Sequence, residues 1–390
     1  MKQYLFYIVK YFKWVYTLYF YMGTFLLGIL KLFVKSDDRL ILFISFGGRK
    51  FDDSPKSIFD EMIKDNRFDG YKLVWAFTEP QKHIIPQGEK IKVDTLKYFI
   101  TALKARVWIT NSEVERGLAF KDKHTLYFNT WHGTPLKKMG SDISSNSKTF
   151  RAKAPSHYNI FLAQGEYEAD IFSRAFNVEK EKIKVVGLPR NDIYASCSED
   201  YIASLKLCLS IPQGKKIILY APTFREYESN SIGQRILSIP IDLEEWQKQL
   251  SDEWVVLFRA HYEVAKAMNI QSNDFVREMS SYPSLEDLML VADVLISDYS
   301  SIFFDYSIMH KPMLCFAYDF DQYSSQRGMY FDIREHIITV TNESDLLCAI
   351  KQIDIPRESE QAHMFQKRFV TAYGNASKES LNLIYDVLQF

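Results

Sequence analysis

The sequence predicts an α/β protein with two Rossmann-like domains and an N-terminal membrane-associating helix. Short apolar runs alternate with longer amphipathic stretches, and this pattern begins again near Pro212. The first 35 residues, in contrast, are rich in aromatic and apolar side chains. Because strands that alternate with helices indicate parallel sheets, we expect a membrane-associating segment at 1–35, one domain at 36–205 and a second at 206–390, facing each other across a cleft.

The N-terminal segment carries no charged residue between Trp14 and Leu30, and lysines flank this run on both sides. About 17 residues is the lower limit for a membrane-spanning helix. No small-residue cleavage site follows, which argues against a removed signal peptide. A spanning anchor, an interfacial helix and a buried core helix are the alternatives. Tyrosines spread along the whole segment favour a helix that lies in the plane of the interface.

Composition excludes some classes of protein. The formal net charge of the 390 residues is −1, so nothing indicates a nucleic-acid binder that relies on bulk charge. The four cysteines form no C-x-x-C pair, which is typical of reduced thiols in a cytosolic compartment. No two Cys or His lie at zinc-ligand spacing, and the sequence predicts no metal site of this kind.

The alternation predicts strands and helices in order. The expected strands of the first domain are 40–46, 72–77, 107–110, 125–129, 160–163 and 184–186, and those of the second are 216–220, 255–259, 294–297 and 313–316. Expected helices include 54–65, 166–176, 284–291, 302–310 and a final helix at about 360–390. Ligands of such sheets bind at the carboxyl ends of the strands.

The most distinctive strand end is Asn129-Thr-Trp-His-Gly-Thr-Pro-Leu-Lys-Lys-Met-Gly140. An apolar strand leads directly to His132, and the Gly and Pro that follow prevent regular structure. This places an imidazole on a loop near backbone amides and two lysines, where it can meet a hydroxyl and a phosphate. The alternative is a histidine hydrogen-bonded in an ordinary turn.

Two strand ends of the second domain carry groups suited to an anion. Arg259 and His261 end a buried strand, and residues two apart on a strand point to the same side. Ser300 and Ser301 follow another strand and begin a helix, whose free amides form a phosphate site; the alternative is an ordinary N-cap.

Two further strand ends repeat this pattern of an apolar run followed by polar groups. Gly187-Leu-Pro-Arg-Asn-Asp192 presents Arg190, and Tyr220-Ala-Pro-Thr-Phe-Arg225 presents Thr223 and Arg225.

The order WHGTPLKK, GLPRND, APTFR, RAH and SDYSSIFFD resembles the CDP-glycerol glycerophosphotransferase family of teichoic acid synthesis, from about Leu40 to Arg334. The resemblance implies a GT-B-like fold, peripheral attachment to the cytoplasmic side of the cell membrane, and no cofactor or essential metal. It implies CDP-glycerol as the donor, bound by the second domain, and a lipid-linked (undecaprenyl diphosphate) saccharide or polymer as the acceptor, with the first domain as the acceptor domain. No nucleic acid is expected as a partner.

The resemblance also implies roles for single residues. His132 corresponds to the general base, and His261 is the second catalytic candidate. The residues expected to bind the donor or its phosphates are Gly133, Thr134, Pro135, Leu136, Arg190, Pro222, Thr223, Arg225, Arg259, Ala260, Ser300, Ser301 and Asp305. An acceptor hydroxyl would lose its proton to His132 and attack the phosphorus nearest the glycerol, with CMP leaving.

Three alternatives remain open. A nucleotide-sugar glycosyltransferase of GT-B type would transfer a sugar, a related enzyme would use CDP-ribitol, and a scaffold protein would transfer nothing.

The acids Asp319 and Asp321 form a D-x-D pattern like that of metal-dependent sugar transferases, but this pattern is short and common. The chain lacks the long N-terminal region of the larger polymerases, so we expect a primer-type or short-chain role to be as open as polymerisation.

Overall fold

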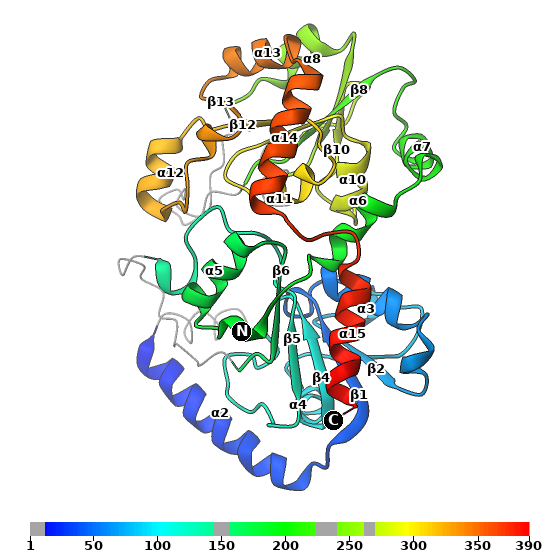
Figure 1. The fold of residues 1–390 in the computed structure, drawn as a ribbon, viewed down its shortest axis with the longest axis vertical. Helices are drawn as coiled ribbons and strands as arrows, with labels where there is room; N and C mark the ends of the chain where they lie inside the picture. The colour runs from blue at the N-terminus through cyan, green and yellow to red at the C-terminus, as the bar shows by residue number, and fades with distance from the viewer. Residues whose placement is uncertain (1–11, 144–156, 224–239, 261–269, 390) are drawn as a thin grey trace. The chain divides into compact units, whose positions relative to one another are not determined.

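The computed structural model describes residues 12–143, 157–223, 240–260 and 270–389. The chain forms two compact units. The first comprises Met1–His132, Met139–Asp192 and Ala372–Phe390, and the second comprises Gly133–Lys138 and Ile193–Thr371. Each unit contains one sheet (Figure 1).

The sheet of the first unit has seven strands in the order β3-β2-β1-β4-β5-β6-β7. All pairings between these strands are parallel. The strands are β1 (Asp37–Ile44), β2 (Lys72–Phe77), β3 (Glu89–Lys92), β4 (Ala105–Thr110), β5 (Leu126–Asn129), β6 (Ile160–Ala163) and β7 (Ile183–Val185). The edge strand β3 was not predicted, and the bounds of the others lie within three residues of the expected ones.

Both faces of this sheet are buried, which is why its strands are continuous apolar runs. Leu42 and Ile44 of β1 belong to one hydrophobic cluster, and Ile41 and Phe43 belong to another on the opposite face. This alternation follows from the two-residue period of a strand. The helices of this unit are α2 (Lys13–Phe33), α3 (Asp53–Met62), α4 (Leu96–Lys104), α5 (Glu166–Phe176) and α15 (Ala376–Leu388).

The sheet of the second unit has six strands in the order β10-β9-β8-β11-β12-β13, again with parallel pairings throughout. The strands are β8 (Lys216–Tyr220), β9 (Trp254–Phe258), β10 (Val276–Glu278), β11 (Val294–Ser297), β12 (Met313–Phe316) and β13 (Ile338–Val340). The two edge strands, β10 and β13, were not predicted. The two sheets of parallel strands confirm the predicted α/β class.

Polar side chains fix where several helices of the second unit begin. Ser198, Asp242, Ser284, Asn342 and Asp354 each accept a hydrogen bond from a backbone N–H in the first turn of the helix that follows. The helices are α6 (Asp192–Ser196), which starts at the last residue of the first unit, α7 (Glu199–Cys208), α8 (Leu243–Leu250), α10 (Leu285–Val291), α11 (Ile302–Ser307), α12 (Phe320–Arg327), α13 (Glu343–Lys351) and α14 (Ile355–Phe369).

The division into units differs from the expected boundaries at the C-terminus. Instead of one helix at 360–390, α14 belongs to the second unit and α15 to the first. Leu381 and Ile384 of α15 are buried in the core around β1 and β2, and Figure 1 shows α15 beside α3. Asp192 accepts hydrogen bonds from the backbone of Ala376 and Ser377, which fastens the start of α15 to the first unit.

The other boundary also differs, because residues 193–205 group with the second unit and not with the first. Tyr201 of α7 donates a hydrogen bond to Asp287 of α10 at 3.0 Å, and Tyr194 contacts the sulfur of Met289. These contacts hold α6 and α7 against α10, which explains the earlier boundary.

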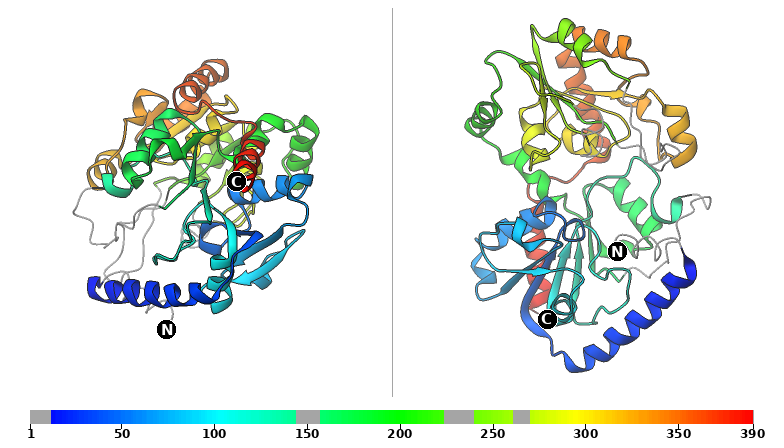
Figure 2. Two further views of the ribbon diagram at one scale, coloured as in Figure 1. Left: turned by 60° about the horizontal axis from the view of Figure 1, so that its bottom comes forward. Right: turned by 180° about the vertical axis from the view of Figure 1, so that it is seen from behind.

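Helix α2 packs lengthwise on one segment of the first unit (Figure 2). The hydroxyls of Tyr16 and Tyr19 donate to the carbonyls of Gly117 and Arg116, and Lys31 forms an ion pair with Asp122 at 2.7 Å. The large apolar side chains on the other faces of the helix are exposed: Trp14, Leu18, Tyr21, Met22, Phe25, Leu26, Ile29, Leu32 and Phe33. Trp14–Phe33 is long and apolar enough to cross a membrane, by length and composition alone.

Candidate active site

In the first unit, His132 lies just beyond the carboxyl end of β5, as the sequence predicted. The turn that leads to it is held by Asn129, which is fully buried. The amide of Asn129 donates to the carbonyl of Ser112, and its oxygen accepts the backbone N–H of Trp131. Trp131 has a positive φ of 53°, which turns the chain sharply and stacks its ring on His132 at 4.2 Å between centroids.

The imidazole of His132 is held through one nitrogen. Nδ1 lies 2.6 Å from the backbone carbonyl oxygen of Asn111. A carbonyl only accepts, so Nδ1 carries the hydrogen, and Nε2 of the neutral ring is left with its lone pair. Burial lowers the pKa of His132, while the hydrogen bond to Asn111 and the charge of Asp53 act in the opposite direction. With its pKa lowered, the ring is mainly neutral at neutral pH.

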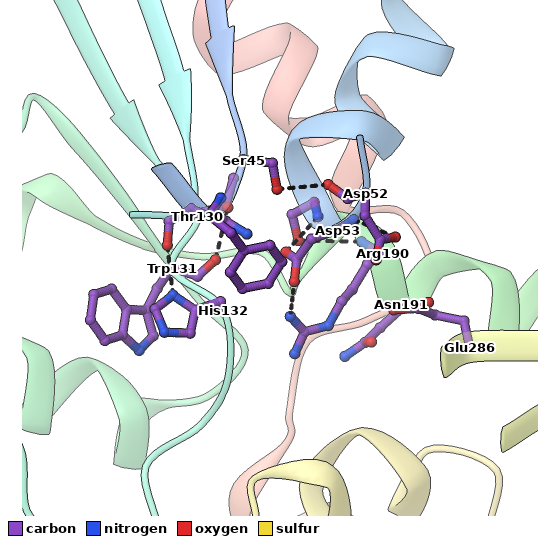
Figure 3. A network of polar contacts seen from close by, with 12 residues as sticks. Ser45, Asp52, Asp53, Thr130, Trp131, His132, Arg190, Asn191 and Glu286 are labelled. Carbon is purple, nitrogen blue, oxygen red and sulfur yellow. Dashed lines mark hydrogen bonds and ion pairs between the residues drawn. The ribbon is translucent and has the colours of Figure 1, made fainter. Parts of the chain in front are cut away.

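A loop after β1 lies against this histidine. The backbone N–H of Phe46 donates to the side-chain oxygen of Asn111 at 2.8 Å, and the N–H of Gly47 donates to the hydroxyl of Ser112 at 3.0 Å. The ring of Phe46 lies 5.7 Å from that of His132 between centroids. Figure 3 shows the region, with Asp53 and Arg190 close by.

Arg190 is buried in the first unit, with its side chain 8% exposed. Its Nη1 lies 2.6 Å from the Oδ2 atom of Asp53, whose side chain is 7% exposed. The backbone N–H of Arg190 also donates to the hydroxyl of Ser54. The expectation for Arg190 was a donor-binding side chain, whereas these contacts attach it to the start of α3.

In the second unit, the loops after β8 and β11 are joined by one carboxylate. Asp298 is buried, and its carboxylate accepts hydrogen bonds from both loops: from the backbone N–H and the hydroxyl of Thr223, at 2.9 and 2.5 Å, and from the N–H of Tyr299 at 2.7 Å. The hydroxyl of Ser297 donates to the carbonyl of Ala221. Pro222 and Thr223, both predicted, stand on the loop after β8, and Asp298 joins that loop to Tyr299, which directly precedes Ser300. Sequence reasoning missed Asp298, although it stands in the quoted motif between the strand and the serines.

Arg259 and Ala260 follow β9, and both are attached to the segment after β10. The Nη1 atom of Arg259 donates to the carbonyls of Met279 and Tyr282, at 3.0 and 2.7 Å. The N–H of Ala260 donates to the hydroxyl of Ser280 at 3.1 Å. One end of the guanidinium therefore supports the backbone of this segment.

Ser300 and Ser301 precede α11, which is only six residues long. The hydroxyl of Ser300 accepts the N–H of Ile302 at 3.3 Å, and Ser301 makes no capping bond with its side chain. Asp305 lies within α11 and is 4% exposed. The expected helix at 302–310 is thus shorter, because 3-10-type hydrogen bonds to Asp305, Tyr306 and Ser307 end it.

The predicted donor loop Gly133–Leu136 belongs to the second unit. The N–H of Tyr330 donates to the carbonyl of Leu136, and the N–H of Lys138 donates to the carbonyl of Gly328. Thr134, Pro135 and Leu136 are buried. The loop is therefore part of the unit that the sequence predicted to bind the donor.

Two predicted site residues, Arg225 and His261, lie outside the described residues. Within the described ranges, no group of three or more His, Cys, Asp or Glu side chains is arranged to hold a metal ion. Of the D-x-D pattern, Asp319 accepts a hydrogen bond from the hydroxyl of Tyr299 at 3.0 Å.

Comparison with known proteins agrees with the resemblance. Residues 26–386 match the family model of CDP-glycerol:poly(glycerophosphate) glycerophosphotransferase. The chain is 33% identical to a teichoic acid glycerol-phosphate transferase of Staphylococcus aureus over 91% of this chain and 95% of that one. It is also 33% identical to a teichoic acid poly(glycerol phosphate) polymerase of Staphylococcus epidermidis, over 89% of this chain but only 50% of the longer polymerase.

A solved structure shows the same similarity in three dimensions. A histidine variant of the wall teichoic acid polymerase TagF, soaked with CDPG, has a TM-score of 0.85 and 31% identity, over 93% of this chain and 92% of that chain. The family match covers most of the chain and includes every described site residue. The chain therefore belongs to the CDP-glycerol:poly(glycerophosphate) glycerophosphotransferase family, and its activity is the transfer of glycerol phosphate from CDP-glycerol in teichoic acid synthesis.

Proposed function

We propose that this protein transfers glycerol phosphate from CDP-glycerol to a lipid-linked saccharide or polymer at the cytoplasmic face of the cell membrane, with His132 as the general base. The observation that carries the assignment of the base is the hydrogen bond from Nδ1 of His132 to the Asn111 carbonyl. It fixes one tautomer and leaves Nε2 as the proton acceptor.

The proposed step is a displacement at phosphorus. Nε2 of His132 takes the proton of the acceptor hydroxyl while its oxygen bonds to the phosphorus nearest the glycerol. The bond from that phosphorus to the oxygen bridging to the cytidylyl phosphate breaks, and CMP leaves with the electron pair. Transfers of this type depend mainly on positioning and on stabilisation of charge on the phosphate oxygens.

The groups that we propose to bind the donor belong to the second unit. Asp298 holds the Thr223 loop and the Tyr299–Ser300 turn together, so the backbone after β8 and β11 has one defined arrangement. Polar groups at the carboxyl ends of neighbouring parallel strands are the usual ligand site of such sheets. We assign the diphosphate and nucleotide contacts to Pro222, Thr223, Arg259, Ala260, Ser300 and Ser301, together with the loop 133–136; Arg225, His261 and Asp305 remain proposed members.

Helix α2 is proposed to attach the protein to the membrane without crossing it. Tyr16, Tyr19 and Lys31 join one face of the helix to the segment from Arg116 to Asp122. If α2 spanned the membrane, it would carry this charged segment into the hydrocarbon. The free-energy cost is about 2.5–3.5 kcal/mol for each charged residue at the bilayer centre. An in-plane helix keeps the segment in water and inserts its exposed apolar side chains instead.

The test is the reaction itself. Purified protein is incubated with a lipid-linked disaccharide and either CDP-glycerol or CDP-ribitol, and CMP release and product mass are measured. We expect CMP and a product heavier by glycerol phosphate. Transfer only from CDP-ribitol would show that the transferred alditol is ribitol and not glycerol. Release of UDP or GDP from a nucleotide sugar would establish the glycosyltransferase alternative. No transfer from any donor would support the scaffold alternative.

A further inference from the structure

The loop between β1 and α3 has an unusual backbone. Phe46 has a φ of 48°, Gly47 of 65° and Gly48 of 89°, and Asp53, the first residue of α3, has a φ of 66°. Left-handed backbone is costly for residues with a side chain, and it persists only where surrounding contacts hold it. We call residues 45–53 the β1–α3 loop. Its two non-glycine left-handed residues, Phe46 and Asp53, stand near its two ends.

The first end of the β1–α3 loop is attached to the residue that holds the base. Asn111 uses its side-chain oxygen for the N–H of Phe46 and its backbone carbonyl for Nδ1 of His132. Phe46 in turn places its ring beside the imidazole. A shift of Phe46 would therefore disturb Asn111, which holds Nδ1 of His132, and it would also move the ring that lies beside the imidazole.

The second end of the loop is held by Arg190. Its guanidinium pairs with Oδ2 of Asp53, while Oδ1 of the same carboxylate accepts the N–H of Ser54 at 2.6 Å. The hydroxyl of Ser45 donates to the carbonyl of Asp52 at 3.0 Å, which links the second end back to the first. Figure 3 shows Ser45, Asp52 and the Asp53–Arg190 pair on one side of the region and His132 on the other.

The charged groups that act on His132 come from three elements. Asp53, at the start of α3, favours the protonated imidazole, whereas Arg190, beyond β7, and Arg49, in the β1–α3 loop, favour the neutral one. Loss of the carboxylate and loss of the guanidinium should therefore have opposite effects on the charge of the ring.

We propose that Asp53 and Arg190 are positioning residues for the transfer reaction, which fasten the strained β1–α3 loop against His132 and balance the charge beside it. The inference rests on the proposed role of His132 as the base. It gives Arg190 a task within the first unit in place of direct contact with the donor. Asp53, which the motifs of the sequence did not point to, becomes part of the machinery of the base.

The experiment compares Asp53→Asn, Arg190→Gln and the double variant, with kcat/KM for CDP-glycerol measured across the pH range. Asparagine tolerates left-handed backbone, so Asp53→Asn removes the charge with little change of shape. The midpoint of the acid limb should move to lower pH in Asp53→Asn and to higher pH in Arg190→Gln. The double variant should return towards the wild-type midpoint, because the two opposing charges are both gone.

The positioning role has its own readout. In Asp53→Asn we expect kcat at the optimum pH to fall about tenfold or more, since small misplacements of a reacting group can cost up to about 10²-fold, while the KM for CDP-glycerol changes little. Removing one partner of a buried pair is destabilising, so thermal melts accompany each variant. The double variant leaves no unpaired charge from this pair. It is therefore the variant to measure if a single variant does not fold. Asp65→Asn, which breaks the exposed pair with Arg67, is the matched control and should leave the profile unchanged.

The outcomes separate this inference from the proposed function. If His132→Asn retains turnover, the assignment of the base is wrong. If His132→Asn is inactive but folded Asp53 and Arg190 variants keep the wild-type midpoint and kcat, only the positioning role is overturned. A rise in the KM for CDP-glycerol alone, in Arg190→Gln, would return Arg190 to donor binding.

Discussion

Nδ1 of His132 lies 2.6 Å from the carbonyl oxygen of Asn111, and this single hydrogen bond decides which nitrogen of the ring is available for chemistry. The donor nitrogen faces a backbone group that cannot change its protonation state. The other nitrogen is therefore the acceptor in every neutral form of the ring that keeps this bond.

The pH dependence of the reaction should follow His132. Burial lowers its pKa below the ordinary value of 6.5, and only the neutral ring accepts a proton. Activity should therefore be lost as the pH falls through a midpoint below 6.5, and it should be nearly constant from there to neutral pH. The measurement is kcat/KM from CMP release, with the titration of His132 followed by NMR. A midpoint above 6.5 that coincides with the NMR titration would contradict the burial argument.

Replacement of His132 by asparagine should remove the proton acceptor. Loss of a general base typically costs about 10²–10⁴-fold in rate, so kcat should fall by that factor while the melting temperature changes little. His83 is a suitable control because burial also lowers its pKa and its ring stacks on Phe77 at 4.3 Å. His83→Asn should keep wild-type turnover. Equal losses in both variants would indicate a general effect of histidine removal on folding.

Replacement of Asp298 by alanine should weaken donor binding. The variant leaves the amides of Thr223 and Tyr299 and the hydroxyl of Thr223 without their common acceptor. A hydrogen bond to a charged group is typically worth about 1.5–3 kcal/mol, so the KM for CDP-glycerol should rise by about 10-fold or more. Thr223→Val, which removes only the hydroxyl, should show a smaller rise.

The control for this series is Thr339→Val, which removes a hydroxyl that donates to the carbonyl of Ile337 in the same unit. It should leave the KM for CDP-glycerol unchanged. If Asp298→Ala raised only the KM for the acceptor, the loops after β8 and β11 would bind the acceptor and not the donor.

Charges on the exposed face of α2 should release the protein from membranes. Leu18 and Phe25 are 53% and 67% exposed, on the same side of the helix by their spacing. The double variant Leu18→Glu/Phe25→Glu should lose most of its binding to anionic vesicles in a sedimentation assay, and alkaline carbonate should extract much of the wild-type protein.

The matched control for the membrane experiment is Leu96→Glu, which places a charge at a position that is 66% exposed at the start of α4. It should bind vesicles like the wild type. If only detergent extracts the wild-type protein, α2 spans the membrane, and the in-plane proposal is wrong.

The sequence predicted the central strands because burial on both faces makes them nearly continuous apolar runs. Lys72–Phe77, Ile160–Ala163 and Lys216–Tyr220 match their predicted bounds. The edge strands β3, β10 and β13 have three or four residues, and β3 is the charged sequence Glu89-Lys-Ile-Lys92. Such segments become strands only by pairing with a neighbour, and their own sequence carries too weak a pattern to show it.

The two C-terminal helices show another limit. Gly374, with a φ of 86°, lies between α14 and α15 and marks the break that the predicted single helix overlooked. That α15 returns to the first unit depends on Asp192, which lies 184 residues before Ala376 in the chain. A local sequence pattern around α15 cannot show that a residue so far away in the chain caps the helix.

By itself, the sequence determined the parallel α/β class, the positions of His132, Thr223, Arg259 and the two serines at strand ends, and the family. These are local properties, because strand ends and turn residues can be read from the order of apolar and polar side chains. Only the tertiary structure decided which partners these residues have. The Asn111 carbonyl, the Asp53–Arg190 pair and the Asp298–Thr223 bonds join segments 21, 137 and 75 residues apart. Such contacts form only after the strands have assembled, since parallel pairing brings distant strand ends to one edge of the sheet.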